Sequence, residues 1–126
     1  MRYLGIDFGS KRVGIAVSDE EGTMAFPKAV LENTSDLAAA VKKICEENGV
    51  EKIILGESKN YRGEYNPIME KGFVFKEELA RETGLPVELE PEFLTSAQAE
   101  RGSSPDMLDA GAAALILQSF LDRINK

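Results

Sequence analysis

The chain has 126 residues, of which 43% are hydrophobic and 29% are charged, and this length and composition predict a single globular domain. It contains no histidine, which excludes histidine-assisted serine or cysteine nucleophiles and histidine-ligated zinc. The net charge of −7 argues against strong overall attraction to nucleic acid, so any such site would need a local basic patch or a metal ion.

The single cysteine and the lack of long apolar segments indicate the cellular compartment. Cys45 lies in a helical stretch and is expected to be a buried structural thiol, because a lone cysteine cannot form a disulfide within the chain. No apolar run approaches the roughly 20 residues that span a bilayer, and the N-terminus lacks a signal-peptide pattern. We therefore expect a cytoplasmic protein with no membrane partner.

Three strands are expected in the first quarter of the chain. Apolar runs cover residues 2–8, 13–17 and 24–31, with short polar turns between them. Pro27 inside the third run indicates an edge strand or a bulge, because proline cannot donate to the ladder. The short connections predict an antiparallel meander.

Helices and strands alternate through the rest of the chain. Helical patterns cover residues 36–48, 67–83 and the stretch from 105 onwards, strands cover 52–56 and 86–92, and residues 57–66 form a polar loop. Crossover helices join parallel strands, so this order predicts an α/β fold with a mixed five-stranded sheet covered by helices.

Two of these helices carry more specific expectations. Thr34 or Ser35 should cap the first helix, and Gly49 should end it. The last helix should bury four apolar residues at helical spacing: Leu108, Ala112, Leu115 and Ile116.

The first expected strand ends in a carboxylate. Asp7 stands directly before a glycine turn, at the kind of strand end where ligands bind in open α/β sheets. An aspartate in this position can also simply cap the turn. Spacing alone leaves both interpretations open.

Asp7 lies in the motif GIDFGSKRVGIAVSD, residues 5–19. This motif closely resembles the opening motif of the YqgF family, and the resemblance continues at residues 92–99 and at Asp109 with residues 112–122. Members of this family are described as Holliday-junction resolvases and as nucleases that mature the end of pre-16S ribosomal RNA. The resemblance implies a ribonuclease H-like fold, with a mixed five-stranded sheet in the order 3-2-1-4-5 whose first three strands are antiparallel.

The resemblance also implies phosphodiester hydrolysis assisted by Mg²⁺ or Mn²⁺. In such sites two ions about 4 Å apart are held by carboxylates from separate elements. Asp7 matches the family's first-strand aspartate and would bridge both ions, while Glu92 and Asp109 match the acids after the last strand and on the last helix. The nucleic-acid partner would be structured RNA or branched DNA, and the protein would act as a monomer or a homodimer.

Two departures from the family pattern concern acidic residues. The usual Asp-Glu-Arg motif is Pro91-Glu92-Phe93 here, so one acid and one base are lost. The usual Gly-Leu-Pro after the fourth strand is Gly56-Glu57-Ser58, so one acid is gained. Because related resolvases carry a catalytic glutamate near this position, Glu57 could supply the carboxylate lost at Pro91. The fourth strand should lie beside the first, so Glu57 would then face the same cleft as Asp7. A solvated loop glutamate is the alternative.

Basic and aromatic side chains flank the expected site. The candidates for phosphate binding are Lys11, Arg12, Lys59, Arg62 and Arg101. Each of them could equally belong to an ordinary solvated surface. Tyr61 and Tyr65 could stack on unpaired bases or pack the loop that carries them.

Two other functions stay open from the sequence. The changes at Pro91 and Phe93 would suit a nucleic-acid-binding module that has lost catalysis. An Asp-x-Gly opening also begins the phosphate-binding motif of actin-like and sugar-kinase folds. Those proteins need two such domains around the nucleotide, and this chain has one.

Overall fold

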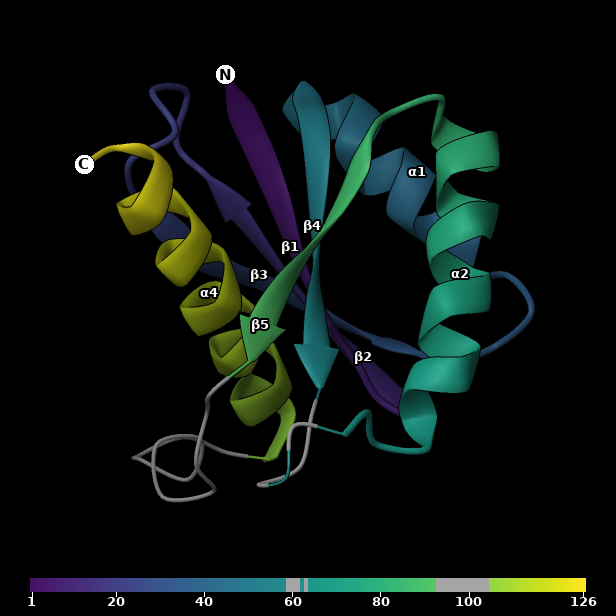
Figure 1. Cartoon of the computed structure of the whole chain (residues 1–126). Helices are drawn as coiled ribbons and strands as arrows, with labels where there is room; N and C mark the ends of the chain where they lie inside the picture. The colour runs from purple at the N-terminus through teal and green to yellow at the C-terminus, as the bar shows by residue number, and fades with distance from the viewer. Residues whose placement is uncertain (59–61, 63, 93–104) are drawn as a thin grey trace.

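A mixed five-stranded sheet runs through the centre of the molecule (Figure 1). The computed structural model describes residues 1–58, 62, 64–92 and 105–126, except for the side chains of Glu92 and of residues 105–109. In chain order the elements are β1 (Arg2–Phe8), β2 (Arg12–Ser18), β3 (Ala25–Glu32), α1 (Leu37–Asn48), β4 (Val50–Ser58), α2 (Ile68–Thr83), β5 (Val87–Glu92) and α4 (Pro105–Ile124). This sequence of strands and helices is the one predicted.

The strands lie in the order β3-β2-β1-β4-β5, which confirms the expected topology. β2 pairs antiparallel with both β1 and β3, because short turns join these three strands. β4 pairs parallel with β1, and β5 pairs parallel with β4, since α1 and α2 carry the chain back between them. Parallel pairing brings the carboxyl ends of β1, β4 and β5 to one edge of the sheet.

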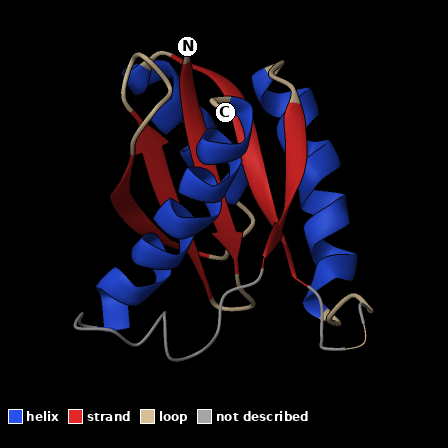
Figure 2. Ribbon diagram, turned by 60° about the vertical axis from the view of Figure 1, so that its left-hand side comes forward, coloured by secondary structure: helices blue, strands red, loops and turns tan. Residues whose placement is uncertain are grey.

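Helices cover both faces of the sheet (Figure 2). α4 lies across one face, whereas α1 and α2 pack against each other on the opposite face. We call these the α4 face and the α1/α2 face. Successive residues of a strand point to opposite faces, so each strand supplies alternate residues to each layer.

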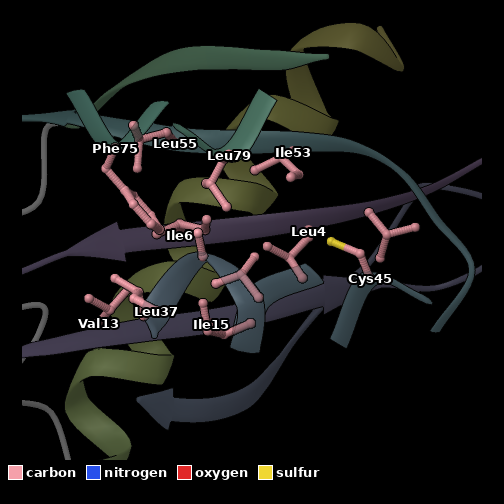
Figure 3. Packing of buried hydrophobic residues seen from close by; sticks show 13 residues of the cluster. Leu4, Ile6, Val13, Ile15, Leu37, Cys45, Ile53, Leu55, Phe75 and Leu79 are labelled. Carbon is pink, nitrogen blue, oxygen red and sulfur yellow. The ribbon is translucent and has the colours of Figure 1, made fainter. Parts of the chain in front are cut away.

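The larger core cluster lies on the α1/α2 face (Figure 3). Leu4 and Ile6 of β1 and Leu55 of β4 are fully buried there, against Phe75 and Leu79 of α2. The smaller cluster lies on the α4 face and consists of Ala16, Ile54, Ala113, Ile116, Leu117, Phe120 and Leu121. The layer under α4 is therefore built from fewer and smaller strand side chains.

Cys45 belongs to the larger cluster and is buried, as expected for a structural thiol. Burial, with a smaller contribution from the charge of Glu46, raises the pKa of the Cys45 thiol to about 11. The thiol therefore stays protonated at neutral pH. Among the described residues, no helix is both long enough and apolar enough to cross a membrane.

β3 is an edge strand with a bulge, so both readings of Pro27 are confirmed. The register shifts between Ile15, which pairs with Ala29, and Ala16, which pairs with Pro27. Two residues before the proline, the backbone amide of Ala25 donates to Oε1 of Gln118 on α4 at 2.9 Å. The start of this edge is therefore closed by a side chain and by a residue without an amide hydrogen.

The expected cap of α1 was wrong. Asp36 is the N-cap residue, and its side chain makes no capping hydrogen bond. Thr34 instead forms the preceding turn, where its carbonyl oxygen accepts from the amide of Leu37 at 3.1 Å and its hydroxyl accepts from the amide of Asp36 at 3.3 Å. The end of the helix is as predicted, because Gly49 adopts a left-handed conformation with φ of 64°.

The buried side of α4 differs from the expected one. Ile116 and Ala112 are buried as predicted, but Leu115 is 44% exposed, and the side chain of Leu108 lies outside the described part. The reason is a close approach at Gly5, where an added Cβ would stand 2.7 Å from Cβ of Leu117. This contact turns Leu117 toward the sheet and leaves Leu115 outside.

Candidate active site

The carboxyl ends of β1, β4 and β5 meet at one edge of the sheet, together with the first turns of α2 and α4 (Figure 1). We call this the carboxyl edge. In open α/β sheets, ligands bind outside the carboxyl ends of the strands, where loops and helix starts surround them. The candidate residues of the sequence are therefore expected here.

Asp7 lies at this edge on the α4 face. Two earlier residues of the same strand define the face: Tyr3 packs edge-on against Phe120 with ring centroids 5.5 Å apart, and Gly5 lies beneath Leu117. Asp7 follows Gly5 by two positions, which is the period of a strand, so its half-buried carboxylate belongs to the same face.

Glycines occupy the strand positions on both sides of Asp7. Gly14 of β2 pairs directly with Asp7, and Gly56 of β4 follows the pair that Leu55 makes with Ile6. Both glycines are buried, and neither of them places a side chain directly beside Asp7. The sequence analysis did not single out these residues, although glycine inside a strand is a known sign of close approach by a ligand or another backbone.

The turn after Asp7 is held by a residue that the sequence analysis missed. Asn33 donates from Nδ2 to the carbonyl oxygen of Gly9 at 2.8 Å, and its amide donates to the carbonyl oxygen of Lys11 at 2.9 Å. Gly9 is needed because an added Cβ would collide with the carbonyl oxygen of Arg12. Two hydrogen bonds thus hold the turn after β1 to the residue that follows β3 and fix the position of the end of β1.

The backbones that carry Glu92 and Asp109 also reach this edge. Glu92 ends β5 and pairs with Ser58, the last residue of β4. α4 runs opposite to β1, because Phe120 lies over Tyr3 and Leu117 over Gly5. Asp109 precedes Ala113 and Leu117, which contact Gly5, by about one and about two helical turns. Asp7 follows Gly5 by about 6.6 Å of strand, so both acids are displaced toward the same edge.

Convergence of the three carboxylates remains a prediction, because only the side chain of Asp7 is described. Among the described residues, no group of three His, Cys, Asp or Glu side chains could hold a metal ion. The donor chemistry nevertheless suits a hard cation. The chain has no histidine and its cysteine is buried, so carboxylate oxygens are the charged donors at this edge, as Mg²⁺ and Mn²⁺ prefer.

Glu57 lies on the other face, in contrast to the expectation that it shares a cleft with Asp7. β4 does lie beside β1 as expected, and it extends through Ser58, so Glu57 is a strand residue and not a loop residue. Leu55 points into the α1/α2 cluster, and Glu57 follows it by two positions. Gly56, one position away, is the neighbour of Asp7.

The contacts of Glu57 agree with this placement. The phenol of Tyr65 donates to Oε2 of Glu57 at 3.4 Å, and the Tyr65 ring packs edge-on against Phe73 of α2 with centroids 5.1 Å apart. The contact with Phe73 supports the prediction that Tyr65 packs the connection that carries it. A catalytic role for Glu57 stays a prediction that no observation tests.

The five basic candidates are placed unevenly. Lys11 and Arg12 are exposed in and beside the turn that follows Asp7, whereas Arg62 is exposed in the connection after β4. Lys59, Arg101 and also Tyr61 lie outside the described residues. Arg12 lines a groove of about 440 Å³ that runs between β3 and the start of α4.

Comparison with known proteins agrees with this architecture. The family model RuvX, described as Holliday junction resolvase, matches residues 1–123. A protein of Pelotomaculum thermopropionicum is 37% identical over 97% of this chain and 87% of its own length, and one of Nitratidesulfovibrio vulgaris is 38% identical over 98% and 85%. Both are named "Putative pre-16S rRNA nuclease".

The fold also has a solved counterpart. The RuvC structure of Thermus thermophilus superposes with a TM-score of 0.63 over 99% of this chain and 97% of that chain, at 16% sequence identity. At this identity the likeness concerns the fold alone, and it confirms the ribonuclease H-like class expected from the sequence. On the match over nearly its whole length, the chain belongs to the RuvX family, which is the YqgF family indicated by its opening motif.

Proposed function

We propose that this protein is a metal-dependent nuclease that hydrolyses phosphodiester bonds in the precursor of 16S ribosomal RNA. The observation that carries the proposal is Asp7, a carboxylate on a rigid strand end, flanked by two strand glycines and approached by the end of β5 and the start of α4. Such an arrangement suits a carboxylate that must meet both a metal ion and a bulky phosphate.

Asp7, Glu92 and Asp109 would hold the metal, from three separate elements at the carboxyl edge. Bound Mg²⁺ or Mn²⁺ would supply a more acidic water and charge stabilisation for the leaving oxygen. The chain's own part is to fix the carboxylates and to place the substrate. The tie between Gly9 and Asn33 serves the first task, and Lys11 and Arg12 beside it serve the second by binding phosphates.

The names of the relatives favour an RNA substrate, whereas the description of the family favours branched DNA. The relatives that share more than a third of their residues with this chain are the nearer guide, and we therefore choose the ribosomal RNA precursor. A four-way DNA junction is the competing substrate that an experiment must include.

The test uses labelled pre-16S RNA and a labelled DNA four-way junction, each with Mn²⁺ and with EDTA. We expect Mn²⁺-dependent cleavage of the RNA that Asp7→Asn lowers by at least about a hundredfold without changing thermal stability. Cleavage of the junction alone would move the substrate to DNA. Cleavage that persists in Asp7→Asn, or in EDTA, would refute the metal site.

A second candidate function is favoured by the changes at Pro91 and Phe93, which remove an acid and a base of the family motif. A binding module without catalysis would hold the RNA, with help from divalent metal, but leave it intact. The same experiment separates the two, provided that binding is measured beside cleavage.

A further inference from the structure

We propose that the groove between β3 and the start of α4 holds one nucleotide of the substrate strand next to the cleavage site. The proposal rests on the proposed nuclease function, since it states where that enzyme would grip its substrate. The groove of about 440 Å³ is lined by Arg12, Pro27, Lys28, Ala29, Val30, Leu31, Glu32 and Ala110. This volume falls in the range of small-molecule sites, about 300–1,000 Å³.

The end of the groove at Arg12 and Glu32 lies on the same face and at the same edge as Asp7. Asp7 pairs with Gly14, and Arg12 stands two positions further along β2, so strand alternation puts Arg12 on the α4 face as well. On the other wall, Ala110 follows Asp109 directly in α4. A strand whose phosphate lies at Asp7 would therefore enter the groove with an adjoining nucleotide.

The lining suits the two halves of a nucleotide. Three apolar lining residues, Pro27, Val30 and Ala110, offer a surface for a base or a sugar on the α4 face. The side chains of Ala29 and Leu31 pack instead against the core cluster on the α1/α2 face. Among the lining residues that the structure describes, Arg12 and Lys28 carry positive charge and Glu32 carries negative charge. In a chain with a net charge of −7, such a groove is a local attraction for phosphate beside carboxylates that repel it.

Lys28 is placed by a feature of the fold. Ala29 pairs with Ile15 and Pro27 pairs with Ala16, so Lys28 is the extra residue of the β3 bulge and has no partner on β2. Bulges commonly re-aim a side chain near an active site. Here the bulge coincides with a cation that lines the groove.

The same strand gives a reason to prefer a nucleotide over another protein strand. Strand addition along β3 needs backbone donors at its open edge. Pro27 has no amide hydrogen, and the amide of Ala25 is already bonded to Gln118. A second copy of the chain, or a peptide, would therefore find an edge that is partly closed.

The test compares Lys28→Glu with Lys43→Glu, an exposed lysine of α1 on the opposite face. Each variant changes the net charge by the same amount, so overall repulsion of RNA is matched. Binding is measured in the Asp7→Asn background with labelled single-stranded RNA at several salt concentrations, which makes the readout independent of cleavage. We expect Lys28→Glu to weaken binding about tenfold and to lower the slope of log K against log salt by about 1, with little change for Lys43→Glu.

A cross-linking experiment locates the contact directly. RNA that carries 4-thiouridine beside the scissile phosphate should cross-link to the peptide that contains residues 25–32. Equal effects of the two lysine variants, or cross-links confined to other peptides, would each overturn the proposal. If Lys28→Glu weakens binding while Asp7→Asn still cleaves RNA, the groove stands and the proposed metal site fails.

Discussion

The two faces of the sheet are built on different principles. The α1/α2 face buries large aliphatic side chains such as Leu4, Ile6 and Leu55 against two helices. The α4 face has Gly5 and Ala16 at its centre, and one helix lies almost directly on the backbone there. One layer is thick and interdigitated, whereas the other is thin and allows little adjustment.

This difference assigns separate tasks to the two layers. Buried aliphatic area is the main source of folding free energy, so the α1/α2 layer should carry most of the stability. Close contact between helix and strand fixes their relative position, so the α4 layer should determine how Asp7 and the start of α4 meet. The following variants test this division, from the largest expected effect to the smallest.

Leu79→Ala should cause the largest loss of stability, because Leu79 is fully buried in the α1/α2 layer. Truncations of this kind lower the free energy of unfolding by about 2–5 kcal/mol, which urea denaturation measures. RNA cleavage per folded molecule should stay unchanged. Val74→Ala on the same helix is the control, since Val74 is 67% exposed, and a comparable loss there would contradict the assignment.

Gly5→Ala should disturb the α4 layer, because the added Cβ would stand 2.7 Å from Cβ of Leu117. Overpacking typically costs about 1–3 kcal/mol, and the displaced helix should lower cleavage per folded molecule as well. Gly111→Ala on α4 is the control, since an added Cβ there meets no atom of the described residues within 4 Å. It should raise stability by about 0.5–1 kcal/mol. Full activity in Gly5→Ala would show that the contact between α4 and Gly5 does not determine the geometry of the active site.

Glu90→Gln should loosen the join between β5 and α4. The Glu90 side chain is 5% exposed and accepts from Ser119 at 3.1 Å and from Arg123. Leaving buried polar groups poorly paired costs about 1–3 kcal/mol. Glu88→Gln, which breaks the more exposed pair with Lys52, should cost less than about 1 kcal/mol. Equal melting temperatures for the two variants would show that the bonds of Glu90 to α4 stabilise the protein no more than the exposed pair of Glu88 and Lys52.

Glu57→Gln should have the smallest effect, because the register puts Glu57 on the α1/α2 face. Its hydrogen bond with Tyr65 is long, and the pair is exposed. We expect a decrease in Mn²⁺-dependent cleavage of less than about threefold, similar to that of Glu64→Gln in the connection that follows β4. A tenfold decrease in Glu57→Gln alone would make Glu57 a working acid of the site, as the loss of an acid at Pro91 suggested.

Local patterns were sufficient to predict much of this fold. The apolar runs gave the strands, the glycine after residue 48 gave the end of α1, and Pro27 marked an edge with a bulge. Asp7 was placed at a strand end for the same reason, because the run before it is continuous and the turn after it contains glycine. Each of these features depends on neighbours in the sequence.

The errors concern features that depend on distant contacts. The face of Glu57 follows from the pairing of Ile6 with Leu55, and a shift of one residue would have reversed it. The orientation of α4 follows from its contact with Gly5, more than a hundred residues earlier in the chain. Helical spacing along α4 alone predicts that Leu115 is buried. The bonds of Asn33 and Gln118 likewise join segments that no local pattern relates.

The protected start of β3 has a consequence for how the protein behaves at high concentration. An unpaired strand edge is a template on which other chains can add, and proteins block such edges with proline, bulges or charge. Here a glutamine from the last helix occupies one donor, proline removes another, and the bulge carries a lysine. The amide of Ala25 stays open until α4 packs on the sheet and brings Gln118 to it. Resistance to fibrous aggregation should therefore arise late in folding, when α4 closes on the sheet.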